Sequence, residues 1–509
     1  MSTRSARIFA ALTAAGIAVT AALSTATANA AAPPATTTKP APAAAGWLAQ
    51  QFTDHYVYPG GSSFDGGSTA DSVFALAAAK AGASKIDAAM RYFAAHVDDY
   101  ASVHDTSGKP GPYDGSVAKA AVAALVTGAD PTHIGGYDLL QILKRDQCTS
   151  ESHPKNSKDY TTPVCPAPGA ARNIFSSVSE SLAILAEARG ARASGASYAP
   201  DAAAVTYLLS LQCANGGFTS LTTGGAHCAA DPDATGFAVM ALQAEGHQQA
   251  ALARAVRWLR GVRNTDGSWT AQGVHNVDST GLAAAALAGQ RIDTRRSRSW
   301  LHSQQVTNGP TVGTGASRGA LKYHGAFDAS SSIKATADGV LGLVAHGDLA
   351  TLTDRRASAG TAVLALPPAH VGRKEVPAGT EQTVTGAGFA AGELVVATLA
   401  SHRVGSATTN HNGTATVTFT APSSLPGKHT ITLTGRTSAL TTSAVMRVVP
   451  ASNSVTTAPA ALGSRAAAPN LASTGQDSRL TELEIVLGVA LIGAGGVIAL
   501  AGCRRAGHR

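Results

Sequence analysis

A pair of apolar helical runs that recurs along the chain restricts what this sequence can fold into. In its clearest copy, residues 202–245, an apolar run on helical spacing continues into a glycine-aromatic turn that ends at Phe218. A polar loop then leads to Asp231, where a second apolar run begins. Neither helix of such a unit can bury its apolar face alone, so units of this kind stack on copies of themselves. The sequence therefore predicts a domain built from repeated helix pairs.

Further copies lie on both sides of this one. The next copy runs from Trp258 through a turn ending at Trp269 to a second run at Asp278. Other copies begin at Trp47, Tyr92, Leu139 and Trp300. We count six helix pairs within residues 45–349, at a spacing of roughly 45–60 residues, which is typical of repeat architectures.

The repeat resembles that of a known group of proteins. Its aromatic-Leu-x3-Gln-x3-Gly-x-aromatic pattern, seen from Tyr207 through Gln212 to Phe218, is similar to the repeat of squalene cyclases and prenyltransferase β subunits. The Asp-x-Thr-Gly start at Asp278 also resembles the transcobalamin and intrinsic-factor family. These resemblances imply an (α/α)6 toroid with alternating outer and inner helices, and the second implies a cobamide-like ligand. Since one toroid carries cyclases, lyases and binding proteins, the fold alone does not give the function.

Two catalytic motifs of these families are incomplete in this chain. The segment from Asp231 to Ala234 is similar to the D-x-D-D acid motif of class II terpene cyclases, but Ala234 stands in place of the last aspartate. The prenyltransferase zinc motif, Asp-x-Cys, has Thr235 in place of cysteine. We therefore favour a non-catalytic toroid that binds a ligand or serves adhesion. The alternative is a secreted enzyme on the same barrel, either a glycan lyase or a divergent terpene cyclase.

The predicted ligand site is the mouth of the toroid at the starts of the inner helices. Four aspartates stand near these starts and favour either helix capping or ligand binding: Asp71, Asp233, Asp278 and Asp338. Four threonines are expected beside them as donors: Thr69, Thr235, Thr280 and Thr336. Our candidate residues for an unknown extracellular ligand are Tyr56, Tyr58, Asp233, Asp278, Tyr323 and His324. A lyase would add Arg318 to Tyr323 and His324, whereas Phe218 and Trp269 are expected to pack their turns.

The N-terminus and the cysteines indicate export. Residues 1–30 combine Arg4 and Arg7, an apolar middle and a small-residue cleavage site, as in a secretion signal, and residues 31–44 form a Pro/Ala/Thr linker. In an exported chain, the even number of cysteines in the repeat domain favours disulfides. We predict the pairs Cys148–Cys165 and Cys213–Cys228, because each spans the loop between the two helices of one repeat. A zinc site is the alternative, although the spacing does not suit paired cysteine ligands.

The C-terminal part changes from helical to strand patterning. Residues 364–450 alternate apolar and Thr-rich polar positions, which predicts an all-β sandwich and resembles the Ig-like modules of bacterial surface proteins. Residues 451–470 are rich in Ala, Ser, Thr and Pro and are predicted to form a flexible wall-spanning linker.

A sorting signal is predicted after this linker, in residues 471–509. Its motif comprises Leu471, Ala472, Thr474 and Gly475, followed by an apolar transmembrane run at 485–502 and a basic end. This order resembles the L-A-x-T-G signal of actinobacterial sortase substrates. It implies that a sortase cleaves after Thr474 and joins the chain to peptidoglycan on the cell surface. A permanent single-span anchor is the alternative.

The charge excludes one class of partner. The chain carries a formal charge of +7, with no run of lysine and arginine outside its termini. This is typical of a mildly basic exported protein, so we expect no nucleic-acid partner.

Overall fold

The computed structural model describes residues 34–57, 65–103, 111–152, 164–224, 228–353 and 360–451. The predicted secretion signal, Tyr58, the sorting motif 471–475 and the apolar run 485–502 lie outside the described residues. No helix in the described part is long and apolar enough to cross a membrane.

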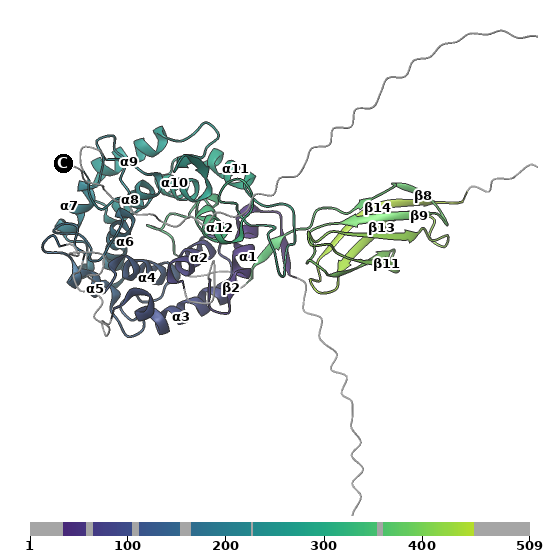
Figure 1. Cartoon of the computed structure of the whole chain (residues 1–509), viewed down its shortest axis with the longest axis horizontal. Helices are drawn as coiled ribbons and strands as arrows, with labels where there is room; N and C mark the ends of the chain where they lie inside the picture. The colour runs from purple at the N-terminus through teal and green to yellow at the C-terminus, as the bar shows by residue number, and fades with distance from the viewer. Residues whose placement is uncertain are drawn as a thin grey trace, which may run out of the picture. The chain divides into compact units, whose positions relative to one another are not determined.

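Within the described residues, six helices form the inner wall of a closed ring (Figure 1). They are α2 (Gly66–Ala78), α4 (Asp114–Thr127), α6 (Ser177–Ser194), α8 (Pro232–Glu245), α10 (Val277–Gly289) and α12 (Ala329–Leu343). Each packs against the next in chain order, and α12 packs against α2, which closes the ring. The predicted toroid of helix pairs is thereby confirmed.

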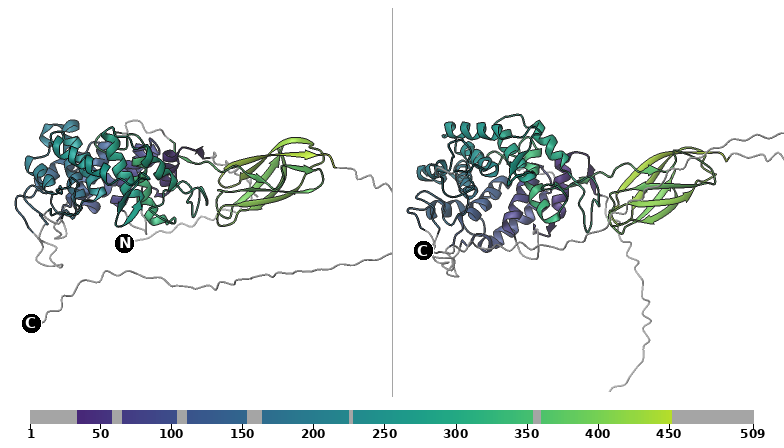
Figure 2. Two further views of the ribbon diagram at one scale, coloured as in Figure 1. Left: turned by 90° about the horizontal axis from the view of Figure 1, so that it is seen from above. Right: turned by 45° about the horizontal axis from the view of Figure 1, so that its top comes forward.

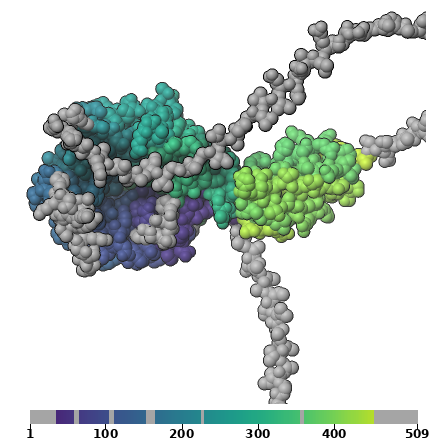
Figure 3. Space-filling view, viewed as in Figure 1, coloured from purple at the N-terminus to yellow at the C-terminus, as the bar shows by residue number. Residues whose placement is uncertain are grey.

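The outer wall consists of the helices that alternate with these. They are α1 (Pro40–Gln50), α3 (Ala83–Ala101), α5 (Leu139–Asp146), α7 (Ala202–Ser210), α9 (Gln249–Gly261) and α11 (Arg295–Ser303). A 3-10 helix, η1 (Ala196–Tyr198), lies before α7. The outer helices α5, α9 and α11 bury one stripe and expose charged residues, whereas inner helices such as α8 and α10 are buried along almost their whole length. Figure 3 shows the described residues of the ring as a space-filling surface, from the same side as Figure 1.

The N-terminal boundary differs from the predicted linker. Helix α1 begins at Pro40, where proline suits the first helical position. Ahead of it, β1 (Ala35–Thr37) pairs in parallel with β6 (Ala362–Leu364). Residues 35–44 are therefore part of the folded ring.

A threonine at each of four inner-helix starts fixes the turn that precedes it. The hydroxyl of Thr235 accepts the backbone N–H of Phe218 at 2.8 Å, and that of Thr280 accepts the N–H of Trp269 at 3.0 Å. Thr69 and Thr336 make the equivalent bonds. All four threonines are buried, as are Phe218 and Trp269. The expectation that these hydroxyls face a ligand was wrong, because the turns occupy them.

The C-terminal ends of the inner helices are closed by a strap, residues 348–352. On α6, the buried Arg189 donates to the carbonyls of Leu349 and Leu352 and to Leu125 of α4. From α8, Gln243 donates to Asp348 at 2.7 Å. The strap thus ties the last turns of several inner helices together at one end of the ring.

Two disulfides brace the loops in front of α6 and α8. Cys148 pairs with Cys165 and Cys213 pairs with Cys228, so both predicted pairs are confirmed. Disulfides are typical of proteins exported to an oxidising compartment.

Short hairpins also precede two inner helices. They comprise β2 (Phe52–Thr53) with β3 (Tyr56–Val57), and β4 (Trp269–Ala271) with β5 (Val274–Asn276).

The C-terminal described residues form two sheets around one apolar core (Figure 2). Their strands are β7 (His370–Val371), β8 (Glu375–Pro377), β9 (Glu381–Gly386), β10 (Leu394–Leu399), β11 (His402–Thr408), β12 (Ala415–Thr420), β13 (Gly427–Gly435) and β14 (Thr441–Val449). One sheet has the order β11-β10-β13-β14-β8 and the other β12-β9-β7. The predicted change to a β-rich region is confirmed.

Helices α10 and α12 approach so closely that only glycine fits at one point. A Cβ on Gly281 would lie 2.2 Å from the carbonyl oxygen of Asp338, whereas a Cβ on Gly236 would meet its nearest atom at an ordinary 3.4 Å. We predict that Gly281→Ala lowers the free energy of unfolding by about 1–3 kcal/mol, measured by urea denaturation.

The matched control is Gly236→Ala on α8. It should leave stability unchanged or raise it by up to about 1 kcal/mol, because alanine favours the helix. Equal destabilisation by both substitutions would contradict the packing account.

Candidate ligand-binding mouth

The helix caps are made by other residues than the four aspartates considered above. Asp65 caps α2 by accepting the N–H of Ser68, and Asp231 caps α8 by accepting those of Asp233 and Ala234. Asn276 and Asp328 cap α10 and α12 in the same way. The capping interpretation of Asp71, Asp233, Asp278 and Asp338 was therefore wrong, and their carboxylates are available for another role.

Two of these carboxylates join two lysines in an ionic network across three inner helices. The ammonium of Lys119, on α4, lies 2.8 Å from the Asp71 carboxylate of α2. On α12, Lys334 lies 2.7 Å from Asp338 and 3.7 Å from Asp71. Burial raises the pKa of Asp71, but the charges of Lys119 and Lys334 outweigh it, so the pKa of this carboxyl is lowered and it remains ionised.

The network reaches solvent through Lys334, whereas Asp71 and Asp338 are buried. Half of the Lys334 side chain, 50 %, is accessible although the residue lies on an inner helix of the ring. Asp233, Asp278 and Tyr323 are also partly exposed. All these residues lie on or just before inner helices, near the N-terminal end of the ring, which is opposite the strap. We call this end the mouth.

Asp233 and Asp278 occupy equivalent places on neighbouring helices of the mouth. Each is the second residue of its helix, α8 or α10, and these helices pack together. In each carboxyl, Oδ1 is buried and has no hydrogen-bond partner among the described residues. Burial, followed by the charge of Asp231, raises the pKa of Asp233 to about 6. Burial, followed by the charge of Asp338, raises the pKa of Asp278 to about 8.

The aromatic candidates divide between the mouth and other places. Tyr323 precedes α12, and its backbone carbonyl accepts the N–H of Val277 at the start of α10. Burial, followed by the charges of Asp278 and Asp233, raises the pKa of Tyr323. His324 is exposed and contacts the Tyr323 ring, with ring centroids 5.0 Å apart.

Two further candidates are occupied elsewhere. The ring of Tyr56 packs against Tyr92 of α3, at 5.0 Å between centroids. Arg318 donates to the backbone carbonyls of Thr307 and Ala365, so the described structure gives it no part in a lyase grouping with Tyr323.

Sequence reasoning missed both lysines of the mouth. Asp71, Lys119 and Lys334 are each the sixth residue of their inner helix. A charged residue at the sixth position of three helices that consist mainly of small and apolar residues was the signal that could have identified them.

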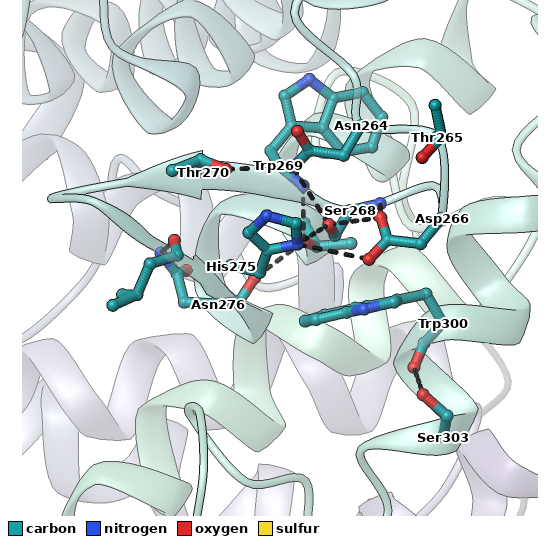
Figure 4. Close-up of polar contacts among 12 residues, drawn as sticks. Asn264, Thr265, Asp266, Ser268, Trp269, Thr270, His275, Asn276, Trp300 and Ser303 are labelled. Atoms are coloured by element: carbon teal, nitrogen blue, oxygen red, sulfur yellow. Dashed lines mark hydrogen bonds and ion pairs between the residues drawn. The ribbon is translucent and has the colours of Figure 1, made fainter.

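A second polar cluster lies on the β4–β5 hairpin, and Figure 4 shows that it is not a catalytic triad. The hydroxyl of Ser268 lies 2.6 Å from an Asp266 oxygen and 2.8 Å from Nδ1 of His275. The same Nδ1 lies 3.2 Å from the other Asp266 oxygen. A triad requires the two imidazole nitrogens to face different partners, so this cluster stabilises the hairpin.

No family model matches this sequence, and no curated protein matches it. Several solved structures are similar over part of the chain. An ent-copalyl diphosphate synthase from Streptomyces platensis is 16% identical over 55% of this chain and 50% of its own, with a TM-score of 0.34. This chain thus matches about half the length of that enzyme.

Two other structures match over almost their whole length. The type II terpene cyclase MstE from Scytonema is 15% identical over 61% of this chain and 97% of its own, with a TM-score of 0.39. An α-1,6-mannanase, GH76A of Salegentibacter sp. HEL1_6, is 12% identical over 61% and 99%, with a TM-score of 0.41.

The raised pKa of Asp278 makes the stability of the fold depend on pH. In the unfolded chain this carboxyl loses its proton near pH 4, whereas in the folded chain it keeps the proton until about pH 8. Its contribution to stability is therefore complete below pH 4 and is lost as the pH rises towards 8. We predict that Asp278→Asn, which cannot ionise, gains Tm relative to the unsubstituted protein as the pH rises from 5 to 8.5.

The control for this measurement is Asp87→Asn, the same change at an exposed position of α3. Its Tm difference from the unsubstituted protein should stay constant over that range. A constant difference for Asp278→Asn as well would show that Asp278 does not hold a proton in the fold.

Proposed function

We propose that this chain is an exported cell-surface protein whose toroid binds a polyhydroxylated ligand, such as an extracellular glycan, in the mouth. The observation that carries the proposal is that the mouth carboxylates are not used as helix caps. Asp71, Asp233, Asp278 and Asp338 converge with two lysines at a solvent-accessible end of the ring. Asp233 and Asp278, each with an unpartnered carboxylate oxygen, lie at the same end of the ring as the half-exposed ammonium of Lys334, and convergent polar groups of this kind are typical of a binding site.

The chemistry of the mouth favours sugar hydroxyls over an apolar ligand. A hydroxyl both donates and accepts hydrogen bonds, and the mouth offers both kinds of partner. Ionised Asp71 accepts, the Lys334 ammonium donates, and protonated Asp278 can do either. An apolar terpene would have to remove these charges from water, which costs free energy. A cobamide-like ligand, with its many amide groups, remains part of the test.

The surface location in this proposal rests on sequence and on the disulfides. The segment from Leu471 to Gly475 and the apolar run after it suggest sortase processing, and the β-rich region suits an Ig-like stalk between wall and toroid. The partners of this proposal are a sortase and peptidoglycan. We predict that wall material released by a muramidase contains a C-terminal peptide that ends at Thr474 and carries a wall fragment. Recovery of surface protein that retains Arg509 would contradict covalent attachment.

The ligand role is tested by titrating the exported chain, residues 31–474, with soluble glycans and cobamides in a calorimeter. We predict that Lys334→Met lowers the affinity for the bound glycan by about tenfold or more, because it removes a charged donor. Asp87→Asn, on the outside of the ring, should leave the affinity unchanged. Unchanged affinity in Lys334→Met, with the fold intact, would place the ligand elsewhere.

A hydrolase is the second candidate, favoured by the two raised carboxyl pKa values. Asp233 and Asp278 occupy equivalent places on neighbouring inner helices, and burial raises the pKa of both, as is typical of carboxyl groups that act as acids or bases near neutral pH. The same titrated samples decide between the functions. A hydrolase would release shorter glycans over hours and would lose that activity in Asp278→Asn, whereas a binding protein would return the glycan intact.

A further inference from the structure

One sector of the ring carries a large excess of positive over negative charge. Residues 249–303, which form α9, α10 and α11, contain eight arginines, no lysine and three aspartates. Their net charge of +5 compares with +7 for the whole chain. The sequence shows no run of basic residues here, because the arginines are spread over two outer helices and the turns beside them.

The arginines of α9 recur at every third residue and form a stripe. They are Arg254, Arg257, Arg260 and, just beyond the helix, Arg263. The first three are exposed and the last is partly exposed. Like charges three residues apart on a helix repel one another and destabilise it. The stripe therefore carries a cost in the free protein that a bound anion would remove.

The arginines of α11 continue this basic surface. Arg263 donates to the carbonyl of Asp293 at 3.1 Å, and Arg296 donates to the carbonyl of Thr265 at 2.9 Å. These bonds join the end of α9 to the start of α11. Figure 1 shows both helices on the outside of the ring, on either side of α10. We call the exposed arginines of the two helices the basic face.

The basic face is poorly neutralised by the protein itself. Among the described residues, Arg295 is the one arginine of the face with a carboxylate partner, Asp293 at 2.8 Å. The guanidinium of Arg298 donates to the hydroxyl of Thr294, a neutral group. Hydrogen bonds to carbonyls and hydroxyls position an arginine but leave its charge uncompensated, so the face attracts anions.

A pocket of suitable chemistry opens at the edge of this face. Between α11 and the start of α1 lies a cavity of about 520 Å³, lined by Lys39, Arg295, Arg298, Ser299 and His302. Its volume lies within the range of sites for small ligands. The planar guanidinium of arginine binds phosphate oxygens in pairs, and a lysine supplies a further point charge. Arg295 is paired with Asp293, but Lys39 and Arg298 have no carboxylate partner in the described structure, and with Ser299 and His302 they suit a phosphate group.

We propose that the basic face binds a phosphodiester-linked polyol polymer of the cell wall, with one phosphate in the Lys39–Arg298 pocket. A linear polyanion matches a stripe of charges on neighbouring helices better than a small ion does. The choice of a wall polymer rests on the proposed attachment of the chain to the wall, which brings such polymers within reach. This contact would orient the toroid on the wall and leave the mouth free for its own ligand.

The test is the binding of synthetic poly(glycerol phosphate) to the exported chain, residues 31–474, by calorimetry at several salt concentrations. The substitutions Arg257→Gln, Arg260→Gln and Arg298→Gln are combined in one variant, since these side chains have no carboxylate partner in the described structure. We expect the variant to bind at least about tenfold more weakly and to depend less on salt, because fewer charges are neutralised.

A matched control removes the same charge from elsewhere. Arg403→Gln, Lys428→Gln and Arg436→Gln together neutralise three exposed cations of the β-rich region. This control should bind as the unsubstituted chain does. An equal loss in both triple variants would overturn the proposal, because binding would then follow net charge alone. The Tm of each variant is measured beside the affinity, so that an unfolded variant is not mistaken for a non-binding one.

Other polyanions decide whether phosphate is recognised. Polygalacturonate, double-stranded DNA and anionic vesicles are titrated under the same conditions. Weaker binding of all three than of poly(glycerol phosphate) supports a wall phosphodiester, whereas tighter binding of any of them overturns that assignment. Lys334→Met, in the mouth, should bind the polymer normally. If no glycan binds in the mouth, the proposal for the basic face is unaffected. If poly(glycerol phosphate) does not bind the basic face, the proposal for the mouth is likewise unaffected.

Discussion

Closure of the inner ring is the constraint on which the rest of the structure depends. Each inner helix packs against two inner neighbours and against outer helices, so nearly every side of it is buried. Small residues are needed where backbones approach, as at Gly281 beside Asp338. A charged residue on such a helix must therefore find a partner or face the opening of the ring. Asp71 and Lys119 pair with each other, and Lys334 is both paired and half-exposed, so these charged residues mark the mouth.

The two ends of the ring have different roles for a physical reason. Inner helices that share one direction present free N–H groups at one end and free carbonyls at the other. At the carbonyl end, Arg189 donates to the backbone of the strap, and Gln243 binds Asp348 there. At the N–H end, Asp65, Asp231, Asn276 and Asp328 satisfy the first turns. Because the caps suffice, none of the other carboxylates of that end is needed as a cap. Asp71 and Asp338 pair with lysines, and Asp233 and Asp278 each keep one oxygen without a partner in the described structure.

The sequence predicted two kinds of feature: helices whose apolar residues recur at regular spacing, and cysteines whose partner lies in the same repeat. Helix pairs follow from apolar spacing, and the loops of Cys148 and Cys213 follow from their position within one repeat. It did not predict which acid caps a helix, because Asp231 and Asp233 differ by two positions and a helix start is not fixed to that accuracy. The basic face also escaped it, since α9 and α11 become neighbours only when the ring forms. The threonines were misjudged because their hydroxyls fit either a turn or a ligand.

The central claim is that the mouth, and no other part of the described structure, holds the ligand of the toroid. A crystal structure of the exported chain with a bound oligosaccharide tests it most directly. The account predicts a sugar ring at the N-terminal ends of α8, α10 and α12, with hydroxyls within hydrogen-bond distance of Asp278 and Lys334. An oligosaccharide found on the β-rich region or on the outer helices, with the mouth empty at saturating concentration, would contradict it.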